Sequence, residues 1–238
     1  MQKTKIEWCN YTWNPIVGCK RGCSYCYAKR IWDRFNPGMA FSEIRVYPDR
    51  LADKMPKEPS KIFVGSMSDF EYWDRADMES VLRVCESNPQ HTFIFLSKSL
   101  PYWLIPWPEN TMQGLTTENP NLDKGKVLRM GDGADCPRPF LSIEPMFGGM
   151  DYACPDYFEC VIAGAQTGPG ANGPADWMIK TILQNVPEEK LFWKDTLKAR
   201  AAKLKAATST TPNKRQGKTA EHLNSMDAAA SPVLGIAK

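Results

Sequence analysis

Three cysteines near the amino terminus have the spacing of a metal-binding loop. Cys19, Cys23 and Cys26 follow a C-x3-C-x2-C pattern, and Tyr25 directly precedes the third. Three thiolates in so short a loop can converge on one inorganic group, and a cubane 4Fe-4S cluster takes four ligands. Such a cluster would keep one iron free of protein, as a catalytic metal keeps one position open for its reactant. The pattern therefore predicts an iron-sulfur site with room for chemistry.

Other interpretations of the cysteine loop stay open. A structural zinc ion needs a fourth ligand; the nearest cysteine is Cys9, and the two histidines, His91 and His222, lie far downstream. The eight cysteines of the chain could also be unrelated small hydrophobic residues. A disulfide framework is the weakest alternative, because no signal peptide is recognised and 238 residues can form a core without cross-links.

The segments around the cysteines resemble one protein family. A C-x3-C-x2-C loop with an aromatic residue before the third cysteine is the signature of the radical S-adenosylmethionine (SAM) superfamily. The chain is most similar to its phage and prophage three-cysteine-motif branch, whose functions are largely unassigned. The matching segments lie, in the family's order, at residues 4–8, 12–15, 18–19, 26–28, 65–69, 114–119, 142–145 and 164–170. The resemblance reaches from residue 4 to about residue 195.

This resemblance implies two cofactors, a 4Fe-4S cluster and SAM. Cys19, Cys23 and Cys26 would ligate the cluster, and the amino and carboxylate groups of SAM would bind the open iron. One electron, from a donor such as flavodoxin or ferredoxin, would cleave the sulfonium to methionine and a 5'-deoxyadenosyl radical. That radical would remove a hydrogen atom from an unactivated carbon of the substrate, so the resemblance implies an enzyme.

Strands and helices alternate through most of the chain. Strands are expected at residues 11–18, 61–65, 91–96, 111–116, 138–144, 158–163 and 190–193, and helices at 25–35, 74–86, 120–130 and 176–185. This alternation is typical of right-handed crossovers and a parallel sheet. We expect an α/β fold, an open β/α barrel of about six parallel strands like that of radical SAM enzymes. Residues 1–193 would form it, and 194–238 a basic helix with a disordered tail.

Polar side chains follow the expected strands, where barrel enzymes have their active sites. They are Ser66, Ser68, Asp69, Ser97, Lys98, Thr116, Thr117, Glu118, Asn119, Ser142 and Glu144, together with the glycine-rich segment 164–170. Any one of them could be a solvated loop residue or a helix cap, such as Asp69 or Asn119. Five polar strand ends near one metal loop nevertheless favour a shared pocket. Glu144 follows an apolar strand and needs a partner, either a ligand group or a buried arginine, and Lys98 is equally ambiguous.

The resemblance also assigns roles to these positions. The turn that holds the methionine amine corresponds to Ser66, Ser68 and Asp69, although it departs from the commoner Gly-Gly-Glu form. The groups that meet the ribose and carboxylate correspond to Thr117, Glu118 and Asn119. Those beside the adenine correspond to Tyr25, Gly164, Gln166 and Gly168. Lys194 matches a lysine that closes the family's last strand, and it joins Glu144 and Lys98 as a candidate catalytic residue.

The charge is uneven along the chain. The net charge is only +3, yet residues 194–218 hold eight basic side chains and one acid. Such a segment could contact the phosphates of a nucleic acid, or it could be a solvated helix with an inert tail. No apolar run approaches the roughly 18 residues that span a bilayer. We expect no membrane partner and a cytoplasmic location, in the host cytoplasm if the protein is phage-encoded.

The substrate is predicted from the resemblance and the basic tail together. Similar phage proteins are linked to hypermodification of DNA bases, including rearrangement of an amino-acid-decorated thymine. We therefore expect isomerisation of a modified thymidine of the glycyl-thymidine type in phage DNA, with the base extruded from the stack. Aromatic residues at 72–73 and 102–107 could stack on bases or belong to the core. The alternatives are a radical SAM enzyme acting on tRNA, a DNA lesion or a peptide, and a non-catalytic zinc- or cluster-containing nucleic-acid-binding protein.

Overall fold

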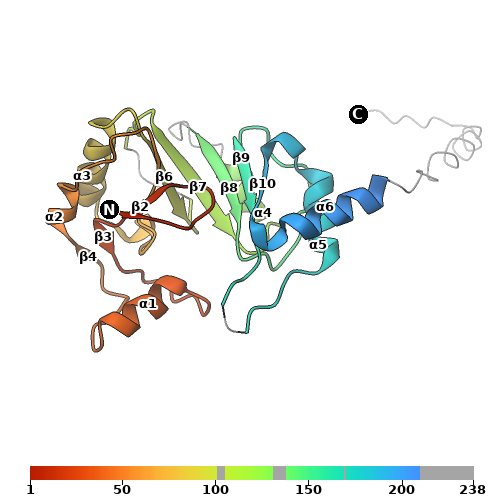
Figure 1. Ribbon diagram of the computed structural model, residues 1–238, viewed down its shortest axis with the longest axis horizontal. Coiled ribbons are helices and arrows are strands. Elements are labelled where there is room, and N and C mark those ends of the chain that lie inside the picture. Colours follow the sequence, from red (N-terminus) through yellow and green to blue (C-terminus); the bar gives the residue numbers. More distant parts are fainter. Residues whose placement is uncertain (101–104, 131–137, 169, 210–238) are drawn as a thin grey trace, which may run out of the picture.

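The fold is built around one eight-stranded sheet (Figure 1). The structure is a computed structural model that describes residues 1–100, 105–130, 138–168 and 170–209. In spatial order the strands are β1 (Gln2–Lys3), β2 (Tyr11–Trp13), β5 (Lys61–Val64), β6 (Thr92–Ser97), β7 (Thr111–Thr117), β8 (Pro139–Ile143), β9 (Cys160–Ala163) and β10 (Leu191–Trp193). Only the β1–β2 pair is antiparallel. From β2 onward, the strands of this sheet lie side by side in the order in which they occur in the chain, with β3 and β4 left out.

The main helices all pack on one face of this sheet, which we call the outer face. They are α3 (Arg75–Glu86), α4 (Lys124–Arg129), α5 (Asp176–Asn185) and α6 (Asp195–Ser209). Met78 and Leu82 of α3 pack with Ile62 and Phe93, while the other three helices cover Leu115, Leu141 and Val161. Alternate residues of a strand point to opposite faces of the sheet. Because these apolar strand residues all point to the outer face, the helices that connect the strands pack on that face.

The opposite, inner face carries a second row of apolar side chains. Its buried residues are Phe63, Ile94, Met112, Phe140 and Ile162, one from each of five adjacent strands. No helix supplies a residue to this cluster within the described ranges; Ile6, Trp8 and Cys9 pack there instead. Residues 4–10 therefore form a strap that runs over the inner face, and we keep this name below (Figure 1).

The remaining elements lie next to β2. A two-stranded sheet pairs β3 (Ile16–Val17) with β4 (Arg45–Val46); in the chain, helix α1 (Tyr27–Phe35) lies between these two strands and α2 (Pro48–Leu51) follows β4. Ala28 and Trp32 of α1 pack against Val17 and Phe41. The cysteine loop lies between β3 and α1, so this small unit fixes both of its ends.

Most elements agree with the sequence-based expectation. The alternation, the parallel sheet and the helix after residue 194 are confirmed, and Leu197 and Ala201 of that helix are buried in the core. The strand expected at 11–18 is two pieces, because Pro15 cannot donate to a sheet ladder. β1, β4 and α2 were not predicted, since two to four residues show no periodicity. The tail expected to be disordered begins at residue 208, but residues 208–209 belong to α6; its remainder from 210 onward and residues 102–104 lie outside the described ranges. No described helix is long and apolar enough to cross a membrane.

Candidate functional site

The cysteine loop lies at the carboxyl edge of the sheet. It is attached there to the turn after β5: the Gly18 amide donates to the Met67 carbonyl (3.0 Å), and the Ser68 hydroxyl donates to the Gly18 carbonyl (2.7 Å). The Cys19 amide donates to the Phe41 carbonyl at 2.9 Å. These bonds join the loop to the edge where the strands of a parallel sheet end together.

The backbone of the loop depends on glycine and on a helix cap. Gly18 has a φ of +112°, and a Cβ atom there would lie 2.1 Å from the Glu43 carbonyl oxygen. At the other end, the Cys26 amide donates to the Cys23 carbonyl (3.1 Å), and its Sγ accepts from the Lys29 amide (3.4 Å). Cys26 is therefore the N-cap of α1, where helix amides face the sulfur.

The three thiols lie on one short loop. Each is half-buried. The pKa of Cys19 is raised to about 11, chiefly by burial; a backbone hydrogen bond at Arg21 opposes this rise, and the nearby charges of Asp69, Cys26 and Cys23 add to it. Among the described residues, no three cysteine, histidine or carboxylate side chains are arranged as ligands of a single metal ion. The donor set, three thiols on one loop, fits an iron-sulfur cluster in its chemistry.

A cavity of about 350 Å³ opens between this loop and the ends of β6 and β7. Six of the residues singled out in the sequence line it: Cys23, Tyr25, Lys98, Thr116, Thr117 and Glu118. Four lining residues that the sequence did not single out as ligand-binding are Arg21, Ser24, Asp123 and Lys126. Arg21 lies within the cysteine loop, so its position there was a usable signal; the other three were not distinguishable from ordinary loop and helix residues.

Glu118 is the centre of the polar contacts in this cavity. It accepts hydrogen bonds from Lys98 Nζ (2.9 Å) and from the Tyr25 hydroxyl, and Lys98 Nζ lies 5.3 Å from the centroid of the Tyr25 ring. Burial alone would raise the pKa of Glu118, but the bonds from Lys98 and Tyr25 outweigh it and lower the pKa. The cavity therefore presents a carboxylate, an ammonium and a phenol held by one another.

This lowered pKa predicts a pH-dependent contribution of Glu118 to stability. A carboxylate with a depressed folded-state pKa stabilises the fold above its unfolded value of about 4.3 and stops doing so as the pH falls through the folded value. Urea unfolding should give the wild type a higher free energy of unfolding than Glu118→Gln. We expect this difference to be constant above about pH 6 and to shrink below about pH 4. Lys98→Met should reduce this pH dependence. An advantage that does not change with pH would contradict the assigned charge state.

Asp69, Ser66 and Ser68 lie at the end of β5 and are bonded to the protein. The buried Asp69 carboxylate accepts from the Ser97 hydroxyl (2.6 Å), the Glu71 amide (3.1 Å) and the Lys98 amide (3.3 Å), and Arg21 Nε lies 3.7 Å away. Asp69 thus caps the short 3-10 helix at 70–72. Ser66 donates to Asn14 Oδ1 at 3.1 Å. In this structure these residues hold the cysteine loop against β5 and β6.

Glu144 and Lys194 form an ion pair farther along the same edge. Glu144 follows β8 and Lys194 follows β10, so Gly164 at the end of β9 lies between them. A Cβ on Gly164 would lie 2.8 Å from Lys194 Cδ and 3.2 Å from the Glu144 carboxyl carbon. The partner that Glu144 needs is therefore a lysine, 50 residues away in the chain.

The last three of the predicted cofactor-binding residues, Asn119, Gln166 and Gly168, do not line the cavity beside the cysteine loop. Asn119 Oδ1 accepts from the Leu122 amide at 3.4 Å in the turn before α4, but the N-cap of α4 is Asp123, so Asn119 is not the helix cap that was the alternative interpretation. Gly168 has a φ of +103°, and its missing Cβ would lie 3.2 Å from the Arg30 guanidinium, so this loop reaches α1. Gln166 is half-buried in the same loop.

Comparison with known proteins gives a family but no described activity. No curated protein and no solved structure matches the chain significantly. One family model, described as "Protein of unknown function (DUF5131)", matches residues 3–225 and so covers nearly the whole chain. The loop, the strand ends and the helices described above all lie within this match. The chain belongs to the DUF5131 family.

Proposed function

We propose that the protein is a radical SAM enzyme, in which Cys19, Cys23 and Cys26 hold a 4Fe-4S cluster and the neighbouring cavity receives SAM. The observation that carries the proposal is the position of the three-cysteine loop: it lies at the carboxyl edge of a parallel sheet, beside a cavity lined by Cys23 and by the residues that end β6 and β7. Three thiols are a set of ligands that leaves one cluster iron free for a substrate or cofactor.

The sheet topology supports the finer assignment to a partial barrel. A doubly wound sheet reverses its strand order and carries helices on both faces. Here seven parallel strands follow in chain order, and α3, α4, α5 and α6 cover the outer face alone. A parallel sheet whose strands follow in chain order, with its helices on one face, is the arrangement of β/α barrels. These barrels have their active sites at the carboxyl ends of the strands.

In this proposal the residues of the cavity bind and orient the cofactor. The cluster and SAM, when bound, would supply the radical that removes hydrogen from the substrate. Lys98 offers a positive charge to a carboxylate, while Glu118 and the Tyr25 hydroxyl offer an acceptor and a donor to hydroxyl or amine groups. Because these three groups already bond one another, they would be held in position before the ligand arrives.

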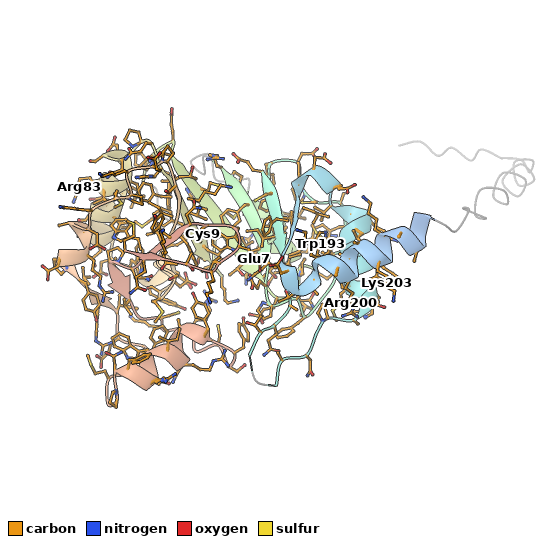
Figure 2. The ribbon with its side chains drawn as sticks, viewed as in Figure 1. Glu7, Cys9, Arg83, Trp193, Arg200 and Lys203 are labelled. Atoms are coloured by element: carbon orange, nitrogen blue, oxygen red, sulfur yellow. The ribbon has the colours of Figure 1, made fainter. Side chains whose placement is uncertain are left out.

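For the substrate we propose a modified thymidine of the glycyl-thymidine type in phage DNA. The described part of the basic segment is α6, whose Lys198 and Lys203 are exposed, whereas Arg200 is bonded to Asp176 (Figure 2). Exposed lysines on one helix suit contacts with phosphates. The Glu144–Lys194 pair offers both a proton donor and an acceptor at the same edge, and either group suits an amino-acid-like substituent.

The proposal is tested by anaerobic reconstitution with iron and sulfide, followed by a strong one-electron reductant and SAM. We expect a broad brown absorbance and production of 5'-deoxyadenosine. Lys194→Met should still form 5'-deoxyadenosine but should lose product formation on DNA. Bound zinc without SAM cleavage would contradict the proposal.

The substrate is tested separately, by mass spectrometry of nucleosides from phage DNA made with and without the gene. Unchanged nucleosides would refute the DNA substrate, and the search would move to tRNA and peptides. SAM cleavage by the purified enzyme would still stand in that case.

A further inference from the structure

A second cavity, of about 600 Å³, lies on the inner face of the sheet at the amino end of the strands. Its walls include Ile94, Met112, Phe140, Ile162 and Phe192, which belong to five adjacent strands. The strap closes it through Trp8 and Cys9. It therefore lies at the opposite edge of the sheet from the cysteine loop, and nothing described so far has used it.

Hydrogen bonds at both ends hold the strap over this cavity. The Asn10 amide donates to the Lys61 carbonyl at 2.8 Å, and the Glu7 carboxylate accepts from the Asp195 amide at 2.7 Å. Glu7 and Cys9 lie over the sheet, with Glu7 close to the end of β10 at Trp193 (Figure 2). The strap is thus a fixed wall, and it joins β2 to the start of α6.

Trp8 lies in this wall, and its indole N–H is a hydrogen-bond donor without an acceptor among the described residues. Its ring centroid lies 4.8 Å from that of Phe63 and 6.4 Å from that of Phe140. Its Nε1 atom is enclosed and has no hydrogen-bond partner among the described residues. An enclosed donor without an acceptor destabilises the fold, so an acceptor supplied by a ligand would offset that cost.

The other walls restrict the kind of ligand. Aromatic faces from Trp8, Phe140 and Phe192 suit a flat ring, and the volume is within the range of small-molecule pockets. The charged lining residues, Glu7 and Lys61, are exposed at the rim, and Glu7 already accepts from Asp195. An ion at the apolar floor would pay a large desolvation cost without a partner.

We propose that this cavity binds a neutral, planar ring that carries a carbonyl group, with the carbonyl accepting a hydrogen bond from Trp8 Nε1. The inference goes beyond the proposed function and does not depend on it. Binding of the ring itself requires neither the cluster nor SAM.

Buried residues of the inner face separate this cavity from the one beside the cysteine loop. Ser142, 1% exposed, lies two residues beyond Phe140 on the same face, and its hydroxyl has no partner within the described part of the chain. Thr116, which pairs with Ser142 on the neighbouring strand β7, lines the cavity beside the cysteine loop. With a rise of about 3.3 Å per residue, Phe140 and Glu144 are about 13 Å apart along β8.

The test is a titration of the full chain, without cluster or SAM, followed through its indole N–H signals by ¹H–¹⁵N NMR. The chain has eight tryptophans, and the Trp8 signal is identified by its loss in Trp8→Phe. The probe is 1,3-dimethyluracil, a neutral ring with two carbonyl acceptors and no N–H. Toluene, a flat ring without an acceptor, is the matched control.

We expect dimethyluracil to move the Trp8 signal downfield and saturably, and toluene to cause no such downfield shift. The signal of Trp177, 53% exposed on α5, should stay unchanged. Met112→Trp, which fills the cavity and leaves the Trp8 indole in place, should abolish the shift. No saturable shift of Trp8, or an equal shift in Met112→Trp, would overturn the inference. Either result leaves SAM cleavage untouched, so the two proposals can fail separately.

Discussion

Cys23→Ala is expected to lower both cluster iron and SAM cleavage to the level of a protein-free control. Cys23 is the cysteine of the loop that lines the cavity proposed to receive SAM. With two of three anchors left, the cluster would lose both its attachment and the orientation of its open iron. Because the radical chemistry belongs entirely to the cofactor, no residual activity from protein groups is expected.

Cys85→Ala is the matched control for this experiment. Cys85 is a fully buried thiol of α3 on the outer face, so its loss removes one sulfur without touching the loop. It should keep full iron content and SAM cleavage. Circular dichroism should show that Cys23→Ala remains folded without its cluster. If Cys23→Ala retained iron and activity, the loop would not be the cluster site.

The second large effect is expected from Gly18→Ala, compared with Gly22→Ala. Both glycines have positive φ, +112° and +71°, so alanine at either site costs about 1–2 kcal/mol of backbone strain. The Gly18 Cβ would also lie 2.1 Å from the Glu43 carbonyl oxygen, whereas no described atom lies within 4 Å of a Gly22 Cβ. A backbone oxygen cannot move aside as a side chain can, so the loop must leave the turn after β5.

We expect Gly18→Ala to lower the free energy of unfolding by about 3 kcal/mol or more, and Gly22→Ala by about 1 kcal/mol. Urea unfolding of the two variants measures the difference. Reconstituted Gly18→Ala should also bind less iron than Gly22→Ala, because the bond between Ser68 and Gly18 is lost with the loop position. Equal stabilities would show that the loop tolerates a shift away from Glu43.

The sheet and the cysteine loop were predictable because their signals are local. Apolar segments of four to seven residues, separated by helices, predicted strands that follow one another in the sheet. The three cysteines lie in one loop, so their spacing could be recognised without knowledge of any distant residue. Glu144 was expected to need a partner, yet Lys194 could not be chosen as that partner from the sequence. The pairing depends on β8 and β10 lying on either side of β9 with a glycine between them.

The roles of Asp69 and Trp8 show where sequence reasoning ends. Asp69 follows a strand in the manner of a ligand-binding acid, but the structure bonds it to Ser97, Lys98 and Glu71. Trp8 gave no signal of its own, because a tryptophan is ordinarily a core residue. Its enclosed N–H emerges only when the strap, Phe63 and Phe140 come together.

The most direct test of the central claim is low-temperature electron paramagnetic resonance of the reconstituted, reduced protein before and after SAM is added. If three cysteines hold a 4Fe-4S cluster with one open iron, the reduced wild type should give a cluster signal that changes when SAM binds that iron. Cys19→Ala, Cys23→Ala and Cys26→Ala should each lose it. A wild-type protein with no cluster signal, or with a signal that SAM leaves unchanged, would contradict the account.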